Sequence, residues 1–217
     1  MRSQTVSIAV IRRLPRYYRC LGTLLQEGHT RISSRDLANR LRLTASQIRQ
    51  DLNCFGGFGQ QGYGYNVEIL RQEIGKILGL EQRHKTIIVG AGNLAHAFAS
   101  HMHFVDAGFE VVAAFDRAEQ MVGSTLAGYP IHGMDELDSF CRENGVDTAI
   151  LCIPEEAAPV VLAQLSKAGI RGVWNFTNYD ITAYYPDMVV ENVQLSDSLM
   201  SLCYLLNERP GEEKAEK

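Results

Sequence analysis

The chain has 217 residues, 46% of them hydrophobic, and a formal net charge of −4 at pH 7. This length holds two small domains with separate cores, and the composition is that of an ordinary globular protein. No run of residues can span a bilayer, and arginines interrupt the only apolar stretch near the N-terminus, so we expect neither a membrane span nor a signal peptide. The five cysteines form no C-x-x-C pair, so we expect neither a disulfide framework nor a zinc site. A cytoplasmic protein fits these features.

Charge divides the chain into two regions. Residues 1–83 contain 13 Lys and Arg against 6 Asp and Glu, whereas residues 84–217 contain 8 against 19. A basic region favours a polyanionic partner such as DNA, although charge supplies affinity without sequence information. A basic and an acidic domain that merely attract each other would give the same split, so charge alone leaves both interpretations open.

The first predicted element is a helix. Apolar residues recur at helical spacing from Leu14 to Leu25. Pro15 is tolerable in a first turn, because its missing N–H is not needed there, and Gly28 is the expected stop.

Two capping signals then predict a helix-turn-helix. Ser-x-x-Asp at residues 33–36 and Thr-x-x-Gln at residues 44–47 resemble helix starts, and a tight turn at residues 42–43 separates them. The second helix would bury Ile48 and Leu52. Its outward side chains, which can hydrogen-bond base edges or phosphates, are those of Ser46, Gln47, Arg49 and Gln50. An ordinary helical hairpin with a polar face is the alternative.

Residues 55–65 are rich in glycine and aromatics and predict a flexible two-stranded wing that touches the minor groove; a mobile surface loop is the alternative. Helical spacing returns over residues 67–80, with Gly79 as a stop. We therefore predict a winged-helix DNA-binding domain over residues 1–83. Its further candidate DNA contacts are Arg12, Arg13, Arg16, Gln61 and Tyr63.

Residues 86–95 predict a strand, a turn and the start of a helix. Thr86–Val89 is a β-branched run typical of a buried parallel strand, and G-x-G-x-x-A follows it directly. The first glycine makes the turn, the second lets the backbone approach a pyrophosphate, and the small third residue lets helix and strand pack. The predicted nucleotide contacts in this turn are Gly90, Ala91, Gly92, Asn93, Leu94 and Ala95.

A second strand over residues 110–115 ends at Asp116, where a carboxylate would accept the ribose hydroxyls. This carboxylate favours NAD over NADP, because it would repel a 2′-phosphate; the alternative is that Asp116 only caps the next helix. Further strands are expected at residues 148–153 and 172–176, in a doubly wound α/β domain over residues 84–195. Their carboxyl ends add candidate cofactor contacts at Ile153, Pro154, Asn175 and Phe176.

No acid–base pair or nucleophile stands at a catalytic spacing, and no third ligand accompanies the two histidines of His101-Met102-His103. We therefore expect neither an enzyme nor a metal site. An amphipathic segment over residues 196–210 predicts a terminal helix that packs on its own domain or on a partner subunit. Residues 211–217 form a charged end that we expect to be disordered.

The chain resembles the Rex family of redox-sensing transcriptional repressors over nearly its whole length. In the first region the resemblance lies in RLPRYYR at residues 13–19, SSRDLA at 33–38, QIRxDL at 47–52 and FGxFGxxGxGY at 55–65. In the second it lies in GAGNL at 90–94, AFD at 114–116, AILxIP at 149–154 and AGIRGVWNF at 168–176. The joint occurrence of these motifs is highly specific.

The resemblance implies a mixed α/β protein, with an N-terminal winged helix-turn-helix domain and a Rossmann-like doubly wound parallel sheet domain. It also implies a homodimer that exchanges the C-terminal helix, with NAD(H) in the Rossmann domain and double-stranded operator DNA on paired winged helices. NADH would release the protein from its operators, whereas NAD⁺ would permit binding.

Several residues depart from the family pattern. Gln50 and Gln61 stand where the recognition helix and the wing usually carry a basic residue. His101 replaces a usual tyrosine near the nicotinamide, and Gln194 replaces a usual aspartate whose partners include an arginine matching Arg19. These three switch residues suggest that discrimination between NADH and NAD⁺ is weaker here or depends on the protonation of His101.

Three other functions remain open at this stage. An oxidoreductase carrying a DNA-like hairpin would turn over NADH with a substrate. A regulator that responds to CoA or another nucleotide would prefer that ligand to NAD(H). A dimerising scaffold with a vestigial pocket would bind none of them.

Overall fold

A computed structural model describes residues 6–60 and 63–208 of the chain. The chain divides between Gln82 and Arg83 into two compact units. Within the described residues no helix combines the length and apolar character needed to cross a membrane.

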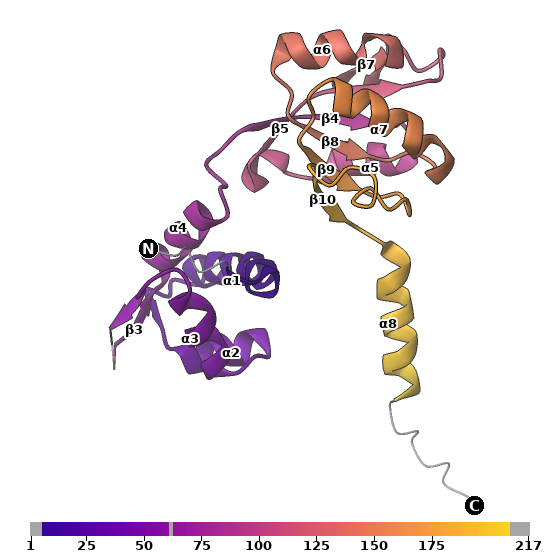
Figure 1. Ribbon diagram of the computed structural model, residues 1–217. Coiled ribbons are helices and arrows are strands. Elements are labelled where there is room, and N and C mark those ends of the chain that lie inside the picture. The colour runs from indigo at the N-terminus through magenta and orange to yellow at the C-terminus, as the bar shows by residue number, and fades with distance from the viewer. Residues whose placement is uncertain (1–5, 61–62, 209–217) are drawn as a thin grey trace, which may run out of the picture. The chain divides into compact units, whose positions relative to one another are not determined.

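In its described residues, 6–60 and 63–82, the N-terminal unit contains four helices and a small sheet (Figure 1). The helices are α1 (Ile8–Gln26), α2 (Ser34–Leu41), α3 (Ala45–Asn53) and α4 (Val67–Ile77). Their buried faces share one apolar core, whose fully buried members include Leu14, Leu21 and Leu37.

The expectation that Pro15 stands in a first turn is wrong. Helix α1 begins at Ile8, where the hydroxyl of Ser7 accepts a hydrogen bond from the backbone N–H of Val10, so that Pro15 lies inside the helix. A proline there removes one backbone hydrogen bond. The helix continues because its buried face extends from Val10 through Leu14 to Leu24, and this burial outweighs the local loss.

The predicted helix-turn-helix is confirmed in its local geometry. The hydroxyl of Ser33 accepts from the N–H of Asp36 at 3.0 Å, and that of Thr44 accepts from the N–H of Gln47 at 3.1 Å. Between the two helices Arg42 adopts φ 56°, the left-handed conformation that ends α2.

The wing belongs to a three-stranded antiparallel sheet. Strands β2 (Gly59–Gln60) and β3 (Gly64–Asn66) form the predicted hairpin, and β1 (Arg31–Ile32) pairs with the other edge of β3. Gly64 has φ +68°, and a Cβ added there would lie 2.5 Å from the carbonyl oxygen of Ile32. A glycine is therefore required where the wing returns to the domain.

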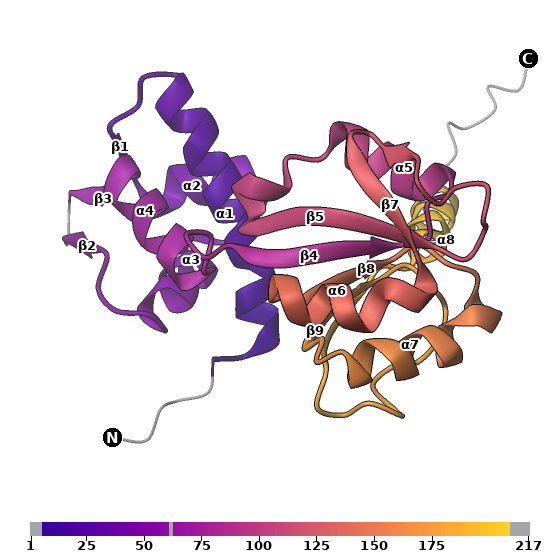
Figure 2. The ribbon, with the colours of Figure 1, turned by 90° about the horizontal axis from the view of Figure 1, so that it is seen from above.

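The C-terminal unit, described from residue 83 to residue 208, is a seven-stranded sheet with helices on both faces (Figures 1 and 2). Its strand order is β10-β9-β8-β4-β5-β7-β6, and all neighbours are parallel except β6 and β7. The strands are β4 (His84–Val89), β5 (Phe109–Asp116), β6 (Thr125–Leu126), β7 (Tyr129–Gly133), β8 (Thr148–Leu151), β9 (Gly172–Asn175) and β10 (Val189–Asn192). The chain runs outward in one direction from β4 to β7 and in the other from β8 to β10, which is the doubly wound arrangement predicted from the sequence.

Two separate cores cover the two faces of this sheet. On one face α5 (Asn93–His101) packs over Ile88, and on the other α6 (Leu137–Asn144) and α7 (Ala158–Lys167) pack over Ile87. Three short 3₁₀ turns connect these elements, at Phe104–Ala107, Met134–Glu136 and Glu155–Ala157. Strand β8 ends two residues earlier than predicted, and β9 ends one residue earlier. The remaining predicted residues belong to the loops at the carboxyl edge of the sheet.

The chain continues from the sheet into α8 (Leu195–Asn207). Every residue of this helix is exposed in the single chain. Its exposed large apolar side chains are those of Leu195, Leu199, Met200, Leu202, Tyr204, Leu205 and Leu206.

Candidate functional site

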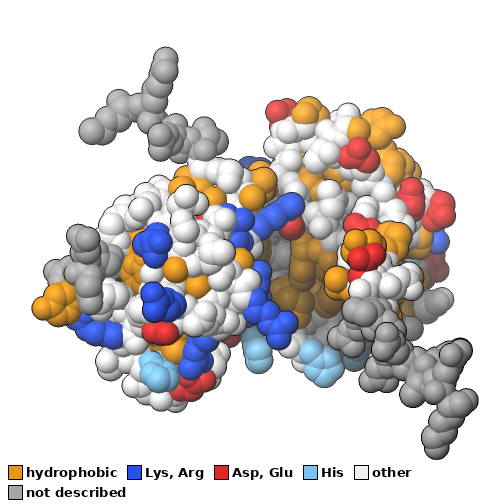
Figure 3. Space-filling view, turned by 90° about the horizontal axis from the view of Figure 1, so that it is seen from below, with side chains coloured by type: hydrophobic (Ala, Val, Ile, Leu, Met, Phe, Trp, Pro, Cys, Tyr) orange, Lys and Arg blue, Asp and Glu red, His pale blue; other side chains and the backbone are white. Residues whose placement is uncertain are grey.

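The outer face of α3 carries three of the predicted DNA contacts. Ser46, Arg49 and Gln50 are exposed, whereas Ile48 and Leu52 are buried as predicted. Arg49 donates a hydrogen bond of 3.1 Å to the hydroxyl of Ser34 on α2, which directs its long side chain along the helix pair. On the face shown in Figure 3, Lys and Arg side chains gather on the N-terminal unit.

The inner face of α3 carries a buried carboxylate that sequence reasoning missed. The side chain of Asp51 is only 1% exposed, and Arg13 on α1 donates to both of its oxygens, at 2.6 and 2.8 Å. The hydroxyl of Tyr17 donates at 2.6 Å and the amide of Gln47 at 2.8 Å. Two predicted DNA contacts, Arg13 and Gln47, thus use hydrogen-bonding groups inside the unit.

These contacts govern the ionisation of the cluster. Burial would raise the pKa of Asp51, but hydrogen bonds from Arg13, Tyr17 and Gln47 outweigh it and leave that pKa below its usual value. The hydrogen bond to Asp51 raises the pKa of Arg13, and burial together with the same carboxylate raises the pKa of Tyr17. The carboxylate is therefore charged, and the tyrosine neutral, at physiological pH.

The remaining candidate DNA contacts lie on α1 and the wing. Arg16 is exposed and donates to the carbonyl of Leu41, at the end of α2, at 2.9 Å. Arg12 is exposed on the same helix, and Gln61 falls outside the described residues. Tyr63 is 69% exposed at the tip of the wing.

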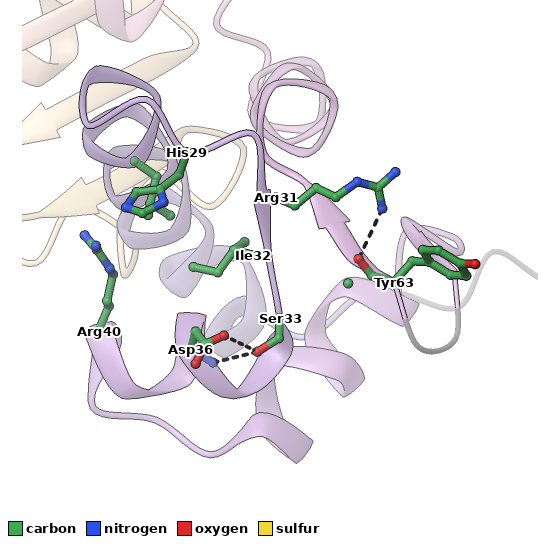
Figure 4. A pocket seen from close by; sticks show the side chains of 9 residues that line it. His29, Arg31, Ile32, Ser33, Asp36, Arg40 and Tyr63 are labelled. Atoms are coloured by element: carbon green, nitrogen blue, oxygen red, sulfur yellow. Dashed lines mark hydrogen bonds between the residues drawn. The ribbon is translucent and has the colours of Figure 1, made fainter.

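A hollow of about 310 Å³ lies beside the wing (Figure 4). On one side Arg31 donates to the carbonyl of Tyr63 at 3.1 Å and lies over its ring, 5.9 Å from the centroid. On the other side Arg40 pairs with Glu27 at 2.7 Å. Both arginines are engaged by neighbours within the unit, and the hollow lies at the base of the wing.

In the C-terminal unit the strand order reverses between β4 and β8, and ligands of doubly wound sheets bind at the carboxyl ends of such strands. Gly90 follows β4 with φ +93°, and a Cβ there would overlap the carbonyl oxygen of Cys152 and approach the side chain of Ile153. Gly92, two residues on, would meet nothing within 4 Å. The first glycine is thus required by the fold, and the second leaves open space.

That open space adjoins the start of α5. Gly92 is the N-cap residue of this helix and supplies no side-chain cap, so N–H groups of the first turn are available to an anion. Asn93, Leu94 and Ala95 form that turn; Asn93 is exposed, Leu94 is half-buried and Ala95 is packed against the sheet.

Asp116 at the end of β5 is tied to the same turn. One carboxylate oxygen accepts from the N–H of Ala91 at 2.7 Å, and the other accepts from the N–H of Ala118 at 2.8 Å. The carboxylate thus holds the glycine turn and also caps the segment that follows β5. An ionised carboxylate has about four acceptor positions, so capacity remains for ribose hydroxyls.

The candidates after β8 and β9 differ in how they are placed. Pro154 is exposed at the start of a 3₁₀ turn. Asn175 is completely buried; its amide donates to the carbonyl of Tyr179 and to Asn192, and its oxygen accepts from the N–H and hydroxyl of Thr177. Asn175 therefore shapes the loop, and its predicted contact with the cofactor stays a prediction.

Phe176 belongs to a half-buried aromatic group on the face of the sheet covered by α5. Its ring centroid lies 4.6 Å from that of Phe98 and 4.6 Å from that of Trp174. The switch candidates Arg19, His101 and Gln194 are all exposed in the single chain.

The chemistry near the turn is that of binding. Burial raises the pKa of the Cys152 thiol to about 12, so a thiolate nucleophile is not available there at neutral pH. Among the residues that the structure describes, no three His, Cys, Asp or Glu side chains gather as metal ligands. The fold and these two sites define a class of protein, a DNA-binding regulator with a nucleotide-binding sensor domain.

Comparison with known proteins agrees with this class. Residues 5–53 match a family model described as "Putative DNA-binding protein N-terminus", and residues 81–179 match one described as "CoA binding domain". The redox-sensing transcriptional repressor Rex of Clostridioides difficile is 50% identical over 95% of this chain and 98% of its own, and that of Caldanaerobacter subterraneus subsp. tengcongensis is 49% identical over 94% and 90%.

Solved structures lead to the same family. The crystal structure of RSP in complex with β-NAD⁺ and operator DNA is 47% identical, covers 94% of each chain and has a TM-score of 0.88. RSP in complex with β-NADH is 44% identical, covers 94% and 96%, and has a TM-score of 0.86. The chain belongs to the Rex family of redox-sensing transcriptional repressors. Because these relatives are repressors, the prediction that the chain is a regulator and not an enzyme is confirmed.

Proposed function

We propose that this repressor binds operator DNA as a homodimer through α3 and the wing, and that NADH at the turn after β4 releases it. The observation that carries the proposal is the open space at Gly92, bordered by the uncapped start of α5 and by Asp116. RSP, a relative of nearly the same length, forms complexes with NAD⁺ and operator DNA and with NADH. Because its target is operator DNA, we propose that the protein acts in the cytoplasm.

The nucleotide would lie across the turn with its pyrophosphate on the N–H groups that begin α5. Asp116 would accept hydrogen bonds from the hydroxyls of the adenosine ribose, at the acceptor positions that the N–H groups of Ala91 and Ala118 leave free. A 2′-phosphate in that place would meet a carboxylate, so NAD(H) is preferred to NADP(H).

The homodimer would form through α8. Seven large apolar side chains on one 13-residue helix are exposed in the single chain, which is more than an isolated helix in water tolerates without a covering partner. A second copy of the chain presents the same helix, and a symmetric interface lets each helix cover the partner.

The redox switch would involve Arg19, His101 and Gln194. A ligand shifts an equilibrium only as far as its affinities for the two states differ, so a charge-sensitive group must stand near the nicotinamide. With His101 and Gln194 in place of a tyrosine–aspartate pair, we propose that discrimination is weak or follows the charge of His101. Gln194→Asp should then strengthen the response to NADH.

The test is a DNA-binding titration at fixed salt with each nucleotide. The full-length protein selects duplexes from a random-sequence library, and the best duplex is titrated with the protein alone and with NAD⁺, NADH, NADP⁺, NADPH or CoA. We expect NADH to weaken binding the most, and Asp116→Ala to relax the exclusion of NADPH. Equal affinity for selected and scrambled duplexes would contradict the proposal.

CoA is the second candidate ligand, because residues 81–179 match a CoA-binding domain model. Both ligands carry an adenosine and a pyrophosphate, so the turn at Gly92 would accept either. CoA, however, carries a phosphate on its ribose close to where Asp116 would lie. We expect NADH to displace bound CoA in a competition titration. If CoA instead displaces NADH, then CoA and not NADH would be the effector.

A further inference from the structure

The four hydrogen bonds to Asp51 join two helices in a specific way. Arg13 and Tyr17 stand four residues apart and therefore on one side of α1, and both reach the same carboxylate. Gln47 occupies a position on α3 one turn before Asp51 and reaches it along the helix. Each carboxylate oxygen accepts two hydrogen bonds, so all of its acceptor positions are used.

This cluster is unlike the apolar contacts that also hold α3. Ile48 and Leu52 are buried, but burial of apolar surface has no preferred direction and allows a helix to turn or slide a little on its support. An arginine fork on a carboxylate fixes both distance and angle. The cluster therefore constrains the rotation of α3 about its own axis.

That rotation matters for the outer face of the same helix. Arg49 and Gln50 stand on α3 within one turn of Asp51, and Ser46 lies one turn before Gln50. Each residue of a helix is turned by about 100° from the next, so these positions rotate together with Asp51. A small rotation at Asp51 moves these three side chains relative to a base edge. A hydrogen bond to a base tolerates little displacement.

We infer that Asp51 and Arg13 are positioning residues for sequence reading, which hold α3 so that its outer side chains meet the bases in register. This inference rests on the proposed binding of operator DNA by α3. In this arrangement Arg13 acts inside the protein and is not a phosphate contact. Arg13 and Asp51 then set how well the protein distinguishes sequences, while the exposed arginines set how strongly it binds any DNA.

The main variant is Asp51→Asn in the full-length protein. The asparagine has the same shape, but its NH₂ group would face donors from Arg13 or Tyr17, so the fork loses an acceptor. Tyr17→Phe is the milder variant, because it removes one donor and leaves the ion pair intact. The matched control is Ile74→Val, a small deletion at a completely buried position of α4 in the same unit.

The probes are the duplex selected by the wild type and its scrambled counterpart, titrated well below the thermal midpoint of each variant. We expect Asp51→Asn to lower the ratio of selected to scrambled affinity by roughly tenfold, as for one misplaced base contact. Tyr17→Phe should lower the ratio less, and Ile74→Val should leave it unchanged. A ratio that Asp51→Asn and Tyr17→Phe both leave at the wild-type value overturns the inference, and so does an equal loss in Ile74→Val.

Salt dependence tests the role of Arg13 separately. Each phosphate contact adds about 0.9 to the slope of log affinity against log salt concentration. Arg13→Gln should lower the selected-to-scrambled ratio and leave the slope for the scrambled duplex at the wild-type value. A slope smaller by about one would make Arg13 a phosphate contact and overturn its positioning role. A wild type that does not prefer its selected duplex would instead contradict operator binding itself.

Discussion

The outer face of α3 presents side chains, whereas the turn after β4 presents mainly backbone groups. On α3 the proposed DNA-binding groups are side chains, and the ion pair between Arg13 and Asp51 lies on the inner face of the same helix. At the turn the proposed nucleotide-binding groups are mainly backbone N–H groups; Gly90 lets the chain pass close to Cys152, and Gly92 leaves open space. A side-chain site can be retuned by substitution while the fold persists, whereas a backbone site depends on the path of the chain itself.

The largest expected effect is that of Gly90→Ala. The new Cβ would overlap the carbonyl oxygen of Cys152, and φ +93° is a conformation that alanine rarely adopts. We expect the free energy of unfolding of the C-terminal unit to fall by roughly 2–5 kcal/mol, from steric overlap and backbone strain together. Urea denaturation followed by the fluorescence of Trp174, the single tryptophan of the chain, measures this unit. An unchanged midpoint would contradict the structural role of Gly90.

Gly92→Val should separate binding from folding at the same turn. A Cβ there meets nothing within 4 Å, so the stability of the C-terminal unit should stay within about 0.5 kcal/mol of the wild type. The valine would occupy the space for the pyrophosphate, and binding of NADH and NAD⁺ should be lost. Calorimetric titration with both nucleotides checks this, and native affinity in the variant would place the pocket elsewhere.

Arg49→Ala tests the side-chain site. If Arg49 makes a bidentate contact with a base, its loss should weaken binding of the selected duplex by roughly 1–3 kcal/mol. Ser34→Ala is the control, because it removes the partner of Arg49 within the protein and keeps the arginine. Titrations at one salt concentration should show a loss for the first variant only. Equal losses would assign the effect to the contact between α2 and α3.

The smallest effect concerns pH. The folded protein holds the pKa of Asp51 below the ordinary value of 3.8, so ionised Asp51 contributes stability above pH 3.8, and this contribution is lost as the pH falls through the lowered folded value. The stability difference between wild type and Asp51→Asn should therefore shrink in acid. Hydrogen exchange of the α3 amides, corrected for intrinsic rates, checks this as the pH is lowered from neutrality to below 3.8. A constant difference would assign the stabilisation to packing alone.

The sequence predicted best those features that depend on neighbouring residues. The caps at Ser33 and Thr44 and the turn at Gly90 each use residues within a few positions, so a local pattern identifies them. The prediction of a first turn at Pro15 was wrong, because the buried face of α1 extends from Val10 and keeps the proline inside the helix.

What the sequence did not reveal depends on distant partners. Asp51 and Arg13 are 38 positions apart, and Asn175 and Asn192 are 17 apart, so no spacing rule joins them. A charged residue on a recognition helix and an asparagine at a strand end both suggest ligand contacts. Only the packing of the elements shows that one carboxylate and one amide face inward.

The buried pair between Arg13 and Asp51 also limits how such a protein diverges. Loss of Arg13 leaves the buried Asp51 without its counter-charge, and loss of Asp51 leaves the half-buried Arg13 without its partner, whereas Ser46, Arg49 and Gln50 can each be exchanged in solvent without that penalty. Operator preference in a lineage can therefore change one exposed residue at a time while the ion pair between Arg13 and Asp51 stays the same. Descendants that read different promoters would still inherit the same arginine and aspartate, and the two would be lost only together.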